Sequence, residues 1–376
     1  MEIGALLDYL KRTRAINQLV ASPITQWGPS NRRMLSPNFL PPRTVQDNYG
    51  TEERVRFRTV AAVDGDRYSP AQMVDSGELF GRLHWRLGHS DLTRQIAGSD
   101  YDGIVNYLNQ NLTMDAAARV VGLTDTLLLQ GMVEHDELMN WDAIVLNSQT
   151  RRGSNGYLEY EEGPSLDGHR VSASVDWTDS TTDPWTSDII PRVMLLQDLG
   201  YSPAGIRVVT TYKVLQTLAD HPATMRRIIS NPLYAGQSIQ EAIGILGQSD
   251  VVSVMIRKLG IKSVDTHDLR IQTKTGEKRA YPEGHMTFIA STGISEEVRY
   301  NVDDPSQVML IENTLGFTGI GRPNGVTNPG RQVALRSFSN QKDSRIELEG
   351  WQTTGPVILE PQAITDIGDI TYGSVY

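Results

Sequence analysis

Residues 54–60 read RVRFRTV and residues 82–87 read RLHWRL, and these two short stretches decide how the whole chain is interpreted. In each, apolar side chains alternate with arginine or histidine, which is the period of two typical of a β-strand. The segment between them carries glycine, proline and aspartate and predicts a loop. The two strands would form a long hairpin with an arginine-studded face. Because an isolated two-stranded hairpin is marginal in water, we expect a neighbouring subunit to complete it.

The segment before the hairpin predicts an extended arm. Residues 3–20 place leucine and isoleucine near helical spacing, and five prolines between 23 and 42 then forbid a continuous helix. The first 60 residues hold nine Lys or Arg against five Asp or Glu, while the rest of the chain carries a net charge of −14. A basic arm on an acidic body excludes nucleic-acid binding over the whole surface but allows the arm to face nucleic acid.

After the hairpin, the longest helical pattern runs over residues 115–147, with Asp115 as its expected cap. Gly122 and Gly131 lie inside it and predict a bend or close packing. At about 1.5 Å per residue this helix would be a spine of roughly 50 Å.

The rest of the chain predicts a connecting hairpin, a mixed unit and a second hairpin. Short strands at 157–160 and 170–175 would form the connection. Asp188 is the expected cap of a helix that ends near Leu199. The other expected elements are strands at 206–211, 264–271, 286–290 and 307–311, helices at 212–219 and 222–230, and a C-terminal hairpin of 333–338 with 345–351. The predicted class is α+β.

The composition of the chain excludes several classes of functional site. The chain has 376 residues, a net charge of −10 and no cysteine, which excludes disulfides, thiolate nucleophiles and cysteine-based metal sites. No apolar run is long enough to span a membrane, and the first residues do not resemble a signal peptide, so we expect no membrane partner. Arginine outnumbers lysine 28 to 7. Guanidinium groups suit bidentate pairing at protein interfaces, although host codon bias would give the same ratio.

Catalytic and metal-binding motifs give no strong signal. His84 and His89 are spaced to point to opposite faces of one strand. The glycine-rich run 316–325 has the wrong spacing for a dinucleotide loop and predicts a surface loop. The charged run 134–137 is interpreted as the solvated side of the long helix, and the aspartates in 176–183 as a polar turn without the spacing of a calcium loop.

One triplet resembles a protease motif. Asp75-Ser76-Gly77 has the Asp-Ser-Gly form that carries the catalytic aspartate of pepsin-like enzymes. Those enzymes need two such aspartates sharing a proton, and this chain has one such triplet. We therefore expect no catalytic residue, no cofactor and no metal, and predict that the chain is not an enzyme.

The order of these elements resembles that of the major capsid proteins of tailed bacteriophages, particularly the lambda capsid protein E family. Three stretches carry the resemblance: WTDSTTDPWTSDIIPRVMLLQDLGYSPAGIRVVTTYKVLQTLADHPATMRR at 177–227, residues 315–321 with 331–336, and residues 351–370, which include GPVILEP at 355–361. It covers about half of the chain, and its motifs are diffuse patterns.

What the resemblance implies is a Hong Kong 97-type capsid fold and the work of a shell subunit. Its parts would be an N-arm at 1–49, an E-loop hairpin at 50–98, a P-domain at 99–183 with the spine helix at about 115–147, an A-domain at 184–330, and P-domain return strands at 331–376. Some members of the wider fold are joined by an isopeptide bond from an E-loop lysine. Residues 50–98 contain no lysine, so the expected shell is non-covalent.

The function expected from this is a head protein that assembles as hexamers and pentamers into an icosahedral virion shell, made in the host cytoplasm. Its partners would be further copies of itself, a portal, a scaffold, a decoration protein and packaged DNA bound without sequence preference on the inner face. The candidate contact residues are Arg54, Arg56, Arg58, Arg82, Trp85 and Arg86, facing acidic residues of the adjacent subunit; a solvated strand face is the alternative for the arginines. An encapsulin-like cellular shell and a tail-tube subunit remain the alternative functions.

Overall fold

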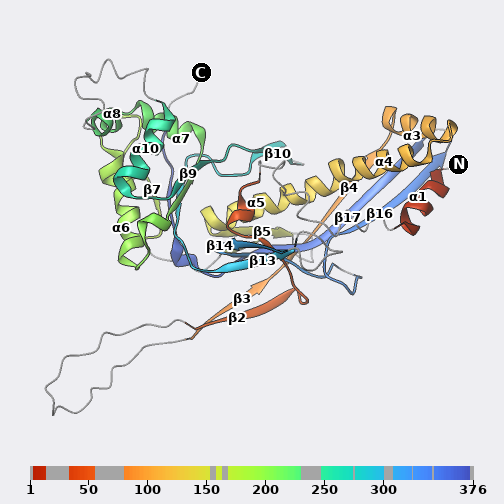
Figure 1. Cartoon of the computed structure of the whole chain (residues 1–376), viewed down its shortest axis with the longest axis horizontal. Coiled ribbons are helices and arrows are strands. Elements are labelled where there is room, and N and C mark those ends of the chain that lie inside the picture. Colours follow the sequence, from red (N-terminus) through yellow and green to blue (C-terminus); the bar gives the residue numbers. More distant parts are fainter. Residues whose placement is uncertain are drawn as a thin grey trace, which may run out of the picture.

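A computed structural model describes residues 3–13, 34–55, 80–152, 158–162, 168–229, 247–273, 276–299, 308–323, 325–340 and 343–372. These residues form an elongated body at one end of which sits a helix-rich α/β unit, with a hairpin projecting from the body (Figure 1). The predicted α+β class is confirmed. None of the helices in these ranges is long and apolar enough to cross a membrane.

The elongated body is a long helix lying along a five-stranded sheet. The helix consists of α4 (Thr113–Thr124), a π-helical turn (Asp125–Leu129) and α5 (Gln130–Leu146). The sheet contains β1 (Pro42–Thr44), β4 (Gly88–Ile96), β15 (Gly316–Ile320), β16 (Gln332–Asn340) and β17 (Asp343–Ile358). β17 is its central strand, pairing with β4 on one side and with β16 and β15 on the other.

The predicted long helix is confirmed, with corrections to its details. It begins at Thr113 after Leu112, which makes no capping hydrogen bond, and Asp115 lies within the first turn. Gly131 packs closely on β4, because a Cβ there would lie 2.9 Å from Leu92 Cδ2. Nothing lies within 4 Å of a Cβ at Gly122. The expected close packing therefore holds for one glycine of the two.

The far end of the body carries two further helices. α1 (Ile3–Arg12) packs on β16 and α4, and α3 (Ser99–Asn109) packs on α4. α1 is shorter than the helix predicted at 3–20, whose last residues lie outside the described ranges. A hydrophobic core joins these helices to the sheet through buried leucine and isoleucine side chains, among them Leu6, Leu10, Ile104, Ile346 and Leu348.

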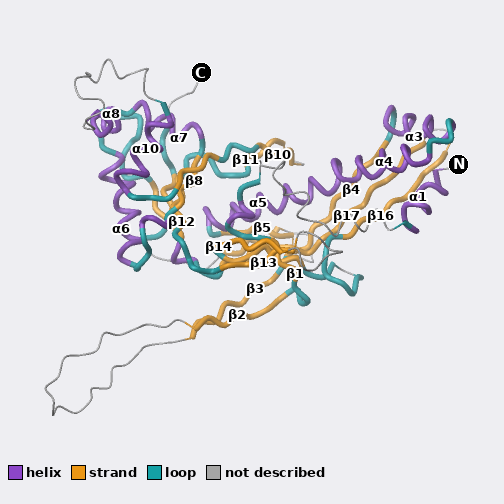
Figure 2. The backbone as a smooth tube through the Cα atoms, in the orientation of Figure 1, coloured by secondary structure: helices purple, strands orange, loops and turns teal. Residues whose placement is uncertain are grey.

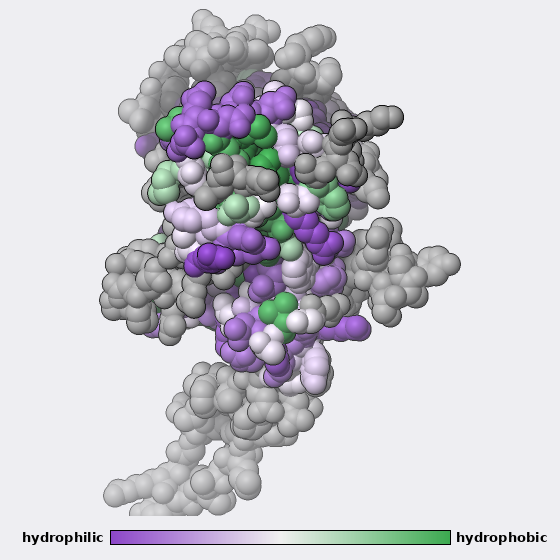
Figure 3. Space-filling view, turned by 90° about the vertical axis from the view of Figure 1, so that its right-hand side faces the viewer, coloured by the Kyte–Doolittle hydropathy of each residue, from purple (hydrophilic) through white to green (hydrophobic). Residues whose placement is uncertain are grey.

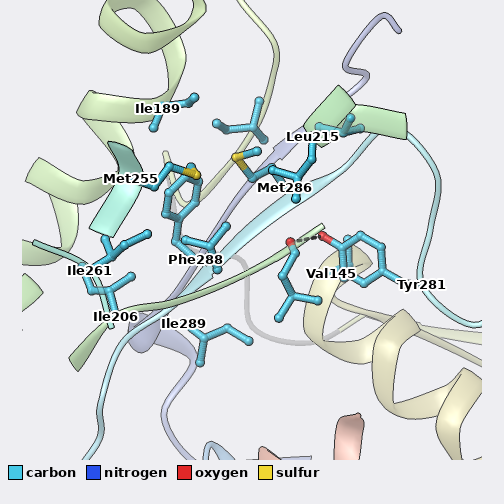
Figure 4. Packing of buried hydrophobic residues seen from close by; sticks show 14 of the residues in the cluster. Val145, Ile189, Ile206, Leu215, Met255, Ile261, Tyr281, Met286, Phe288 and Ile289 are labelled. Carbon is cyan, nitrogen blue, oxygen red and sulfur yellow. Dashed lines mark hydrogen bonds between the residues drawn. The ribbon is translucent and has the colours of Figure 1, made fainter. Parts of the chain in front are cut away.

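The α/β unit has its own five-stranded sheet in the order β7 (Arg170–Ser172), β18 (Ile364–Gly368), β12 (Met286–Ile289), β8 (Arg207–Thr210) and β9 (Ser263–Thr266). Its helices are α6 (Ile190–Asp198), α7 (Tyr212–Asp220), α8 (Pro222–Ile229) and α10 (Gln248–Leu259). Figure 4 shows apolar side chains from these strands and helices converging on Phe288. β7 and β18 come from outside residues 184–330, so the sheet is not made from that range alone.

Three expectations for this region are wrong. The segments at 157–160 and 170–175 do not pair with each other: β6 (Leu158–Glu162) pairs with β5 (Ser148–Arg152), and β7 pairs in parallel with β18. Asp188 does not cap a helix, because it is buried and accepts hydrogen bonds from Ser174 and the Trp177 indole. The single strand predicted at 264–271 is two strands, β9 and β10 (Arg270–Thr273), the latter paired with β11 (Gly276–Arg279).

Candidate subunit-contact surfaces

The projecting hairpin is formed by β2 (Tyr49–Val55) and β3 (Phe80–Arg86). Within the described residues these two strands pair with each other and with no other strand. Figure 2 shows the hairpin leaving the body on its own. A two-stranded ribbon of this kind has two open edges and little core, so it is suited to contacts outside its own chain.

The register differs from the arginine-studded face expected from the sequence. Arg54 pairs with Gly81, whereas Arg82 pairs with Glu53 and Arg86 with Tyr49. Paired residues share a side of the ladder and neighbours along a strand alternate, so Arg54 occupies the opposite parity to Arg82 and Arg86. Arg56 and Arg58 lie outside the described residues. Arg86 is exposed, as is Tyr49 beside it, whose exposed fraction is 75%.

Trp85 lies at the base of the hairpin and packs on its own chain. Its ring meets Phe317 edge-on, with centroids 6.1 Å apart at 88°, and Gly50 lies opposite it on β2. A Cβ on Gly50 would overlap the indole ring. The half-buried Trp85 therefore anchors the hairpin to the sheet. Whether it also touches a second subunit stays a prediction.

The prediction that the charged run 134–137 lies on the solvated side of the long helix is wrong for two of its acids. Asp136 and Glu137 are each only 2% exposed and are not on the solvated side. Asp136 accepts hydrogen bonds from Arg331 (2.7 Å), Gln352 (3.0 Å) and Thr354 (2.8 Å), which ties the helix to the sheet. These acids cannot serve as acceptors for a neighbouring subunit's arginines.

Glu137 ties two other parts of the molecule to the helix, the segment at 35–36 and His267, and it also bonds to Trp141 within the helix. It accepts hydrogen bonds from the backbone N–H of Leu35 (3.0 Å), from Ser36 and from the Trp141 indole (2.8 Å). His267, which follows β9, places Nε2 2.9 Å from Glu137 Oε1. Burial would raise the pKa of Glu137, but the hydrogen bond and charge of His267, with the bonds from Ser36 and Leu35, outweigh it and lower the pKa.

The spacing of the helix sequence could have revealed these two acids. Asp136 and Glu137 lie four residues after the buried pair Met132 and Val133 and four before Asn140 and Trp141. Residues four apart share a helix face, so the acids belong to the apolar stripe. Their partners, at 35–36, 267 and 331–354, come from distant segments and have no sequence signal.

The two histidines and the start of the glycine-rich run, which were considered as binding residues, lie in β-strands. His84 lies on β3 and His89 on β4, and Leu87 separates the two strands, so the single strand assumed for them is wrong. Residues 316–320 are the buried strand β15, which corrects the expected surface loop. Asp75 lies outside the described residues.

The aspartates at 176–183 form polar turns, as predicted. Asp176 accepts hydrogen bonds from the backbone and hydroxyl of Thr178, and Asp179 accepts the equivalent bonds from Thr181. A hydrogen bond from the Thr371 hydroxyl, together with those from Thr178, lowers the pKa of Asp176, and the bonds from Thr181 lower the pKa of Asp179. In the described ranges no three His, Asp or Glu side chains gather closely enough to hold a metal.

A second exposed surface lies at the far end of the body. Figure 3, which views the molecule from that end, shows apolar surface among polar side chains. Tyr107 on α3, Leu112 between the two helices and Met114 on α4 are exposed there, and the exposed fraction of Met114 is 69%. Grouped apolar exposure of this kind is typical of protein contact sites.

Solved structures of other proteins resemble this chain over most of its length. A prophage protein from E. coli CFT073, assigned as a capsid protein, has a solved structure that covers 94% of this chain and 98% of its own, with a TM-score of 0.54 at 11% identity. A phage-related protein from Bordetella bronchiseptica RB50 gives 0.47 at 13% identity, covering 93% of this chain and 96% of its own. A virus-like particle from Pyrococcus furiosus gives 0.42 at 10% identity, covering 93% and 98%.

No family model matches the sequence, and no curated protein matches it. Because the identity to the prophage protein is only 11%, the structural similarity establishes the fold of this chain and nothing beyond it. The chain has the α+β fold of Hong Kong 97-type capsid proteins, as the sequence resemblance predicted.

Proposed function

We propose that this chain is the major capsid protein of a tailed bacteriophage, which self-assembles into the icosahedral shell that encloses the packaged double-stranded DNA. The observation that carries the proposal is the capsid fold over nearly the whole chain. The projecting hairpin supports it, because β2 and β3 find no third strand among the described residues. Many weak contacts between copies would together hold such a shell.

The proposal includes the finer assignments. The parts are the N-arm at 1–49, the E-loop at 50–98, the P-domain at 99–183 with the return strands at 331–376, and the A-domain at 184–330. The partners are hexamers and pentamers of the same chain, a portal, a scaffold, a decoration protein and DNA held without sequence preference. The chain acts as a structural protein of the virion, assembled in the host cytoplasm, and not as an enzyme.

The arginines of the hairpin remain the proposed contact residues, with acceptors on the adjacent subunit other than Asp136 and Glu137. Both of those acids already have partners within the chain. Exposed carboxylates are numerous on an acidic body, so the arginines have other acceptors to meet.

The test is electron microscopy of the purified full-length chain, with light scattering for its mass. Closed shells are the expected result. Tubes would favour the tail-tube alternative, and a compact monomer at high concentration would contradict the proposal. In particles isolated from host cells, DNA and a portal identify a phage head, whereas shells without either favour an encapsulin-like cellular compartment.

A further inference from the structure

The hairpin meets the body at a small group of residues that lie where the sheet ladder stops. β1 runs parallel to β15, and the backbone N–H of Val45 extends that ladder by one bond, to Ile320 O (3.0 Å). The ladder stops there, because the next donor on that side of β15, the N–H of Arg322, bonds to the Asn48 side chain and not to the β1 backbone. From this point the chain turns away into β2.

At this turn the Asn48 side chain takes over from the backbone. Its Oδ1 accepts from the backbone N–H of Arg322, and its Nδ2 donates to the carbonyl of Arg322, both at 2.8 Å. A carboxamide that pairs with one residue in both directions mimics a peptide group and fixes position and angle together. The carbonyl of Asn48 also accepts from Leu87 N–H (2.8 Å), so both ends of the hairpin meet at Asn48.

The Arg322 guanidinium adds a second tie. Its Nε donates to the carbonyl of Gln46, and its Nη2 lies 2.8 Å from Asp47 Oδ1. Glycine is required beside it, because a Cβ on Gly321 would overlap Asn48 Oδ1 and lie 2.8 Å from Leu87 Cδ1. We define Asn48, Gly321 and Arg322 as the joint.

The Arg322 guanidinium is the exposed part of the joint, whereas Asn48 is half-buried and Gly321 is buried. The side chains of Arg322 and Asp47 are 41% and 67% exposed. Exposed ion pairs contribute little to stability, so Arg322 can be replaced without unfolding the chain.

The direction in which the hairpin leaves the body determines where its far end lies, because the hairpin is long. Seven residues of β2 extend about 23 Å at about 3.3 Å per residue. A rotation of about 10° at the base would move the end of β2 by about 4 Å, more than the length of a hydrogen bond at about 2.9 Å.

We propose that Asn48 and Arg322 are positioning residues that fix the direction in which the hairpin leaves the body, and with it the point at which the hairpin meets a second copy. The first part concerns the single chain. The second part rests on the proposed capsid function.

The first part is tested by measuring one distance in the unassembled chain. The chain lacks cysteine, so Thr51→Cys on β2 and Asn106→Cys on α3, both exposed positions, accept spin labels without other changes. Pulsed electron resonance should give one narrow distance distribution. Asn48→Ala removes the paired amide and Arg322→Ala removes the guanidinium, and each should abolish the single narrow peak.

Arg336→Ala is the matched control, because it removes an exposed arginine–glutamate pair with Glu349 on the sheet. It should leave the distribution unchanged. The first part is wrong if the Asn48 and Arg322 variants keep the distance distribution of the parent and melt at the same temperature as the parent.

The second part is read from particle diameters by electron microscopy. The two joint variants should lose the uniform diameter of the parent shells. If a variant that has lost the single distance peak still forms shells with the uniform diameter of the parent, the second part of the proposal is wrong and the first part stands. If the parent forms no shells, the proposed function fails, while the distance measurement still decides the first part.

Discussion

Asp136 and Glu137 are adjacent in sequence but hold different parts of the molecule together. One binds the sheet through Arg331, and the other binds the N-terminal segment and the α/β unit through Ser36 and His267. Buried charges are costly unless each is paired and hydrogen-bonded, and both conditions are met here.

Removing the Glu137 carboxylate should be strongly destabilising, because it leaves His267 and two backbone N–H groups buried without an acceptor. We expect Glu137→Ala to lower the free energy of unfolding by about 3–5 kcal/mol in urea titrations. Asp100→Ala, which removes an exposed pair with Arg119, is the control and should cost less than about 1 kcal/mol. Equal losses in the two variants would contradict the role of Glu137.

The same carboxylate makes stability depend on acid pH. Its pKa in the folded chain lies below the ordinary 4.5, so its contribution is complete above that value and is lost as pH falls through the folded pKa. The free-energy difference between the parent and Glu137→Gln should therefore shrink as the pH is lowered below about 4.5. Urea titrations of both proteins between neutral and acid pH measure it. A constant difference would show that Glu137 does not titrate as proposed.

At the scale of elements, periodic patterns were predictable and distant pairings were not. The long helix and the C-terminal hairpin follow from apolar spacing, and the structure confirms both. The pairing of β7 with β18 joins segments nearly 200 residues apart in parallel, and neither strand carries a signal that names its partner.

The two glycines of the long helix offer a matched pair at this scale. Gly122→Ala adds a methyl group to open space and should stabilise the chain by up to about 1 kcal/mol, the helix preference of alanine. Gly131→Ala gains the same preference but pushes against Leu92, so its net gain should be smaller or negative. Thermal unfolding of both variants compares them. A larger gain at Gly131 would contradict the tight contact between α5 and β4.

For the whole molecule, we expect the hairpin arginines to be required for assembly but not for folding. Replacing Arg54, Arg56, Arg58, Arg82 and Arg86 with glutamate should abolish shells, because like charges would then face an acidic body. Lysine at the same five positions keeps the charge and should retain assembly, weakened by loss of bidentate pairing. Sedimentation separates shells from subunits, and circular dichroism checks the fold. Normal shells from the glutamate variant would contradict the contact proposal.

The absence of lysine from residues 50–98 leads to a second expectation for the assembled particle. Without a lysine amine on the hairpin, the hairpin cannot supply the nucleophile for an isopeptide bond to a neighbouring chain. Intact particles boiled in denaturant should therefore release a single band near 41.7 kDa on a gel. A ladder of larger species would show that covalent joining occurs elsewhere.

The place of β17 and β18 in their sheets has a consequence for synthesis. β17 is the central strand of the body, and β18 lies between β7 and β12 in the α/β unit. Each of them follows all of its strand partners in the chain, so it leaves the ribosome after them. A nascent chain that stops before residue 343 therefore lacks an inner strand in both sheets and cannot complete either of them.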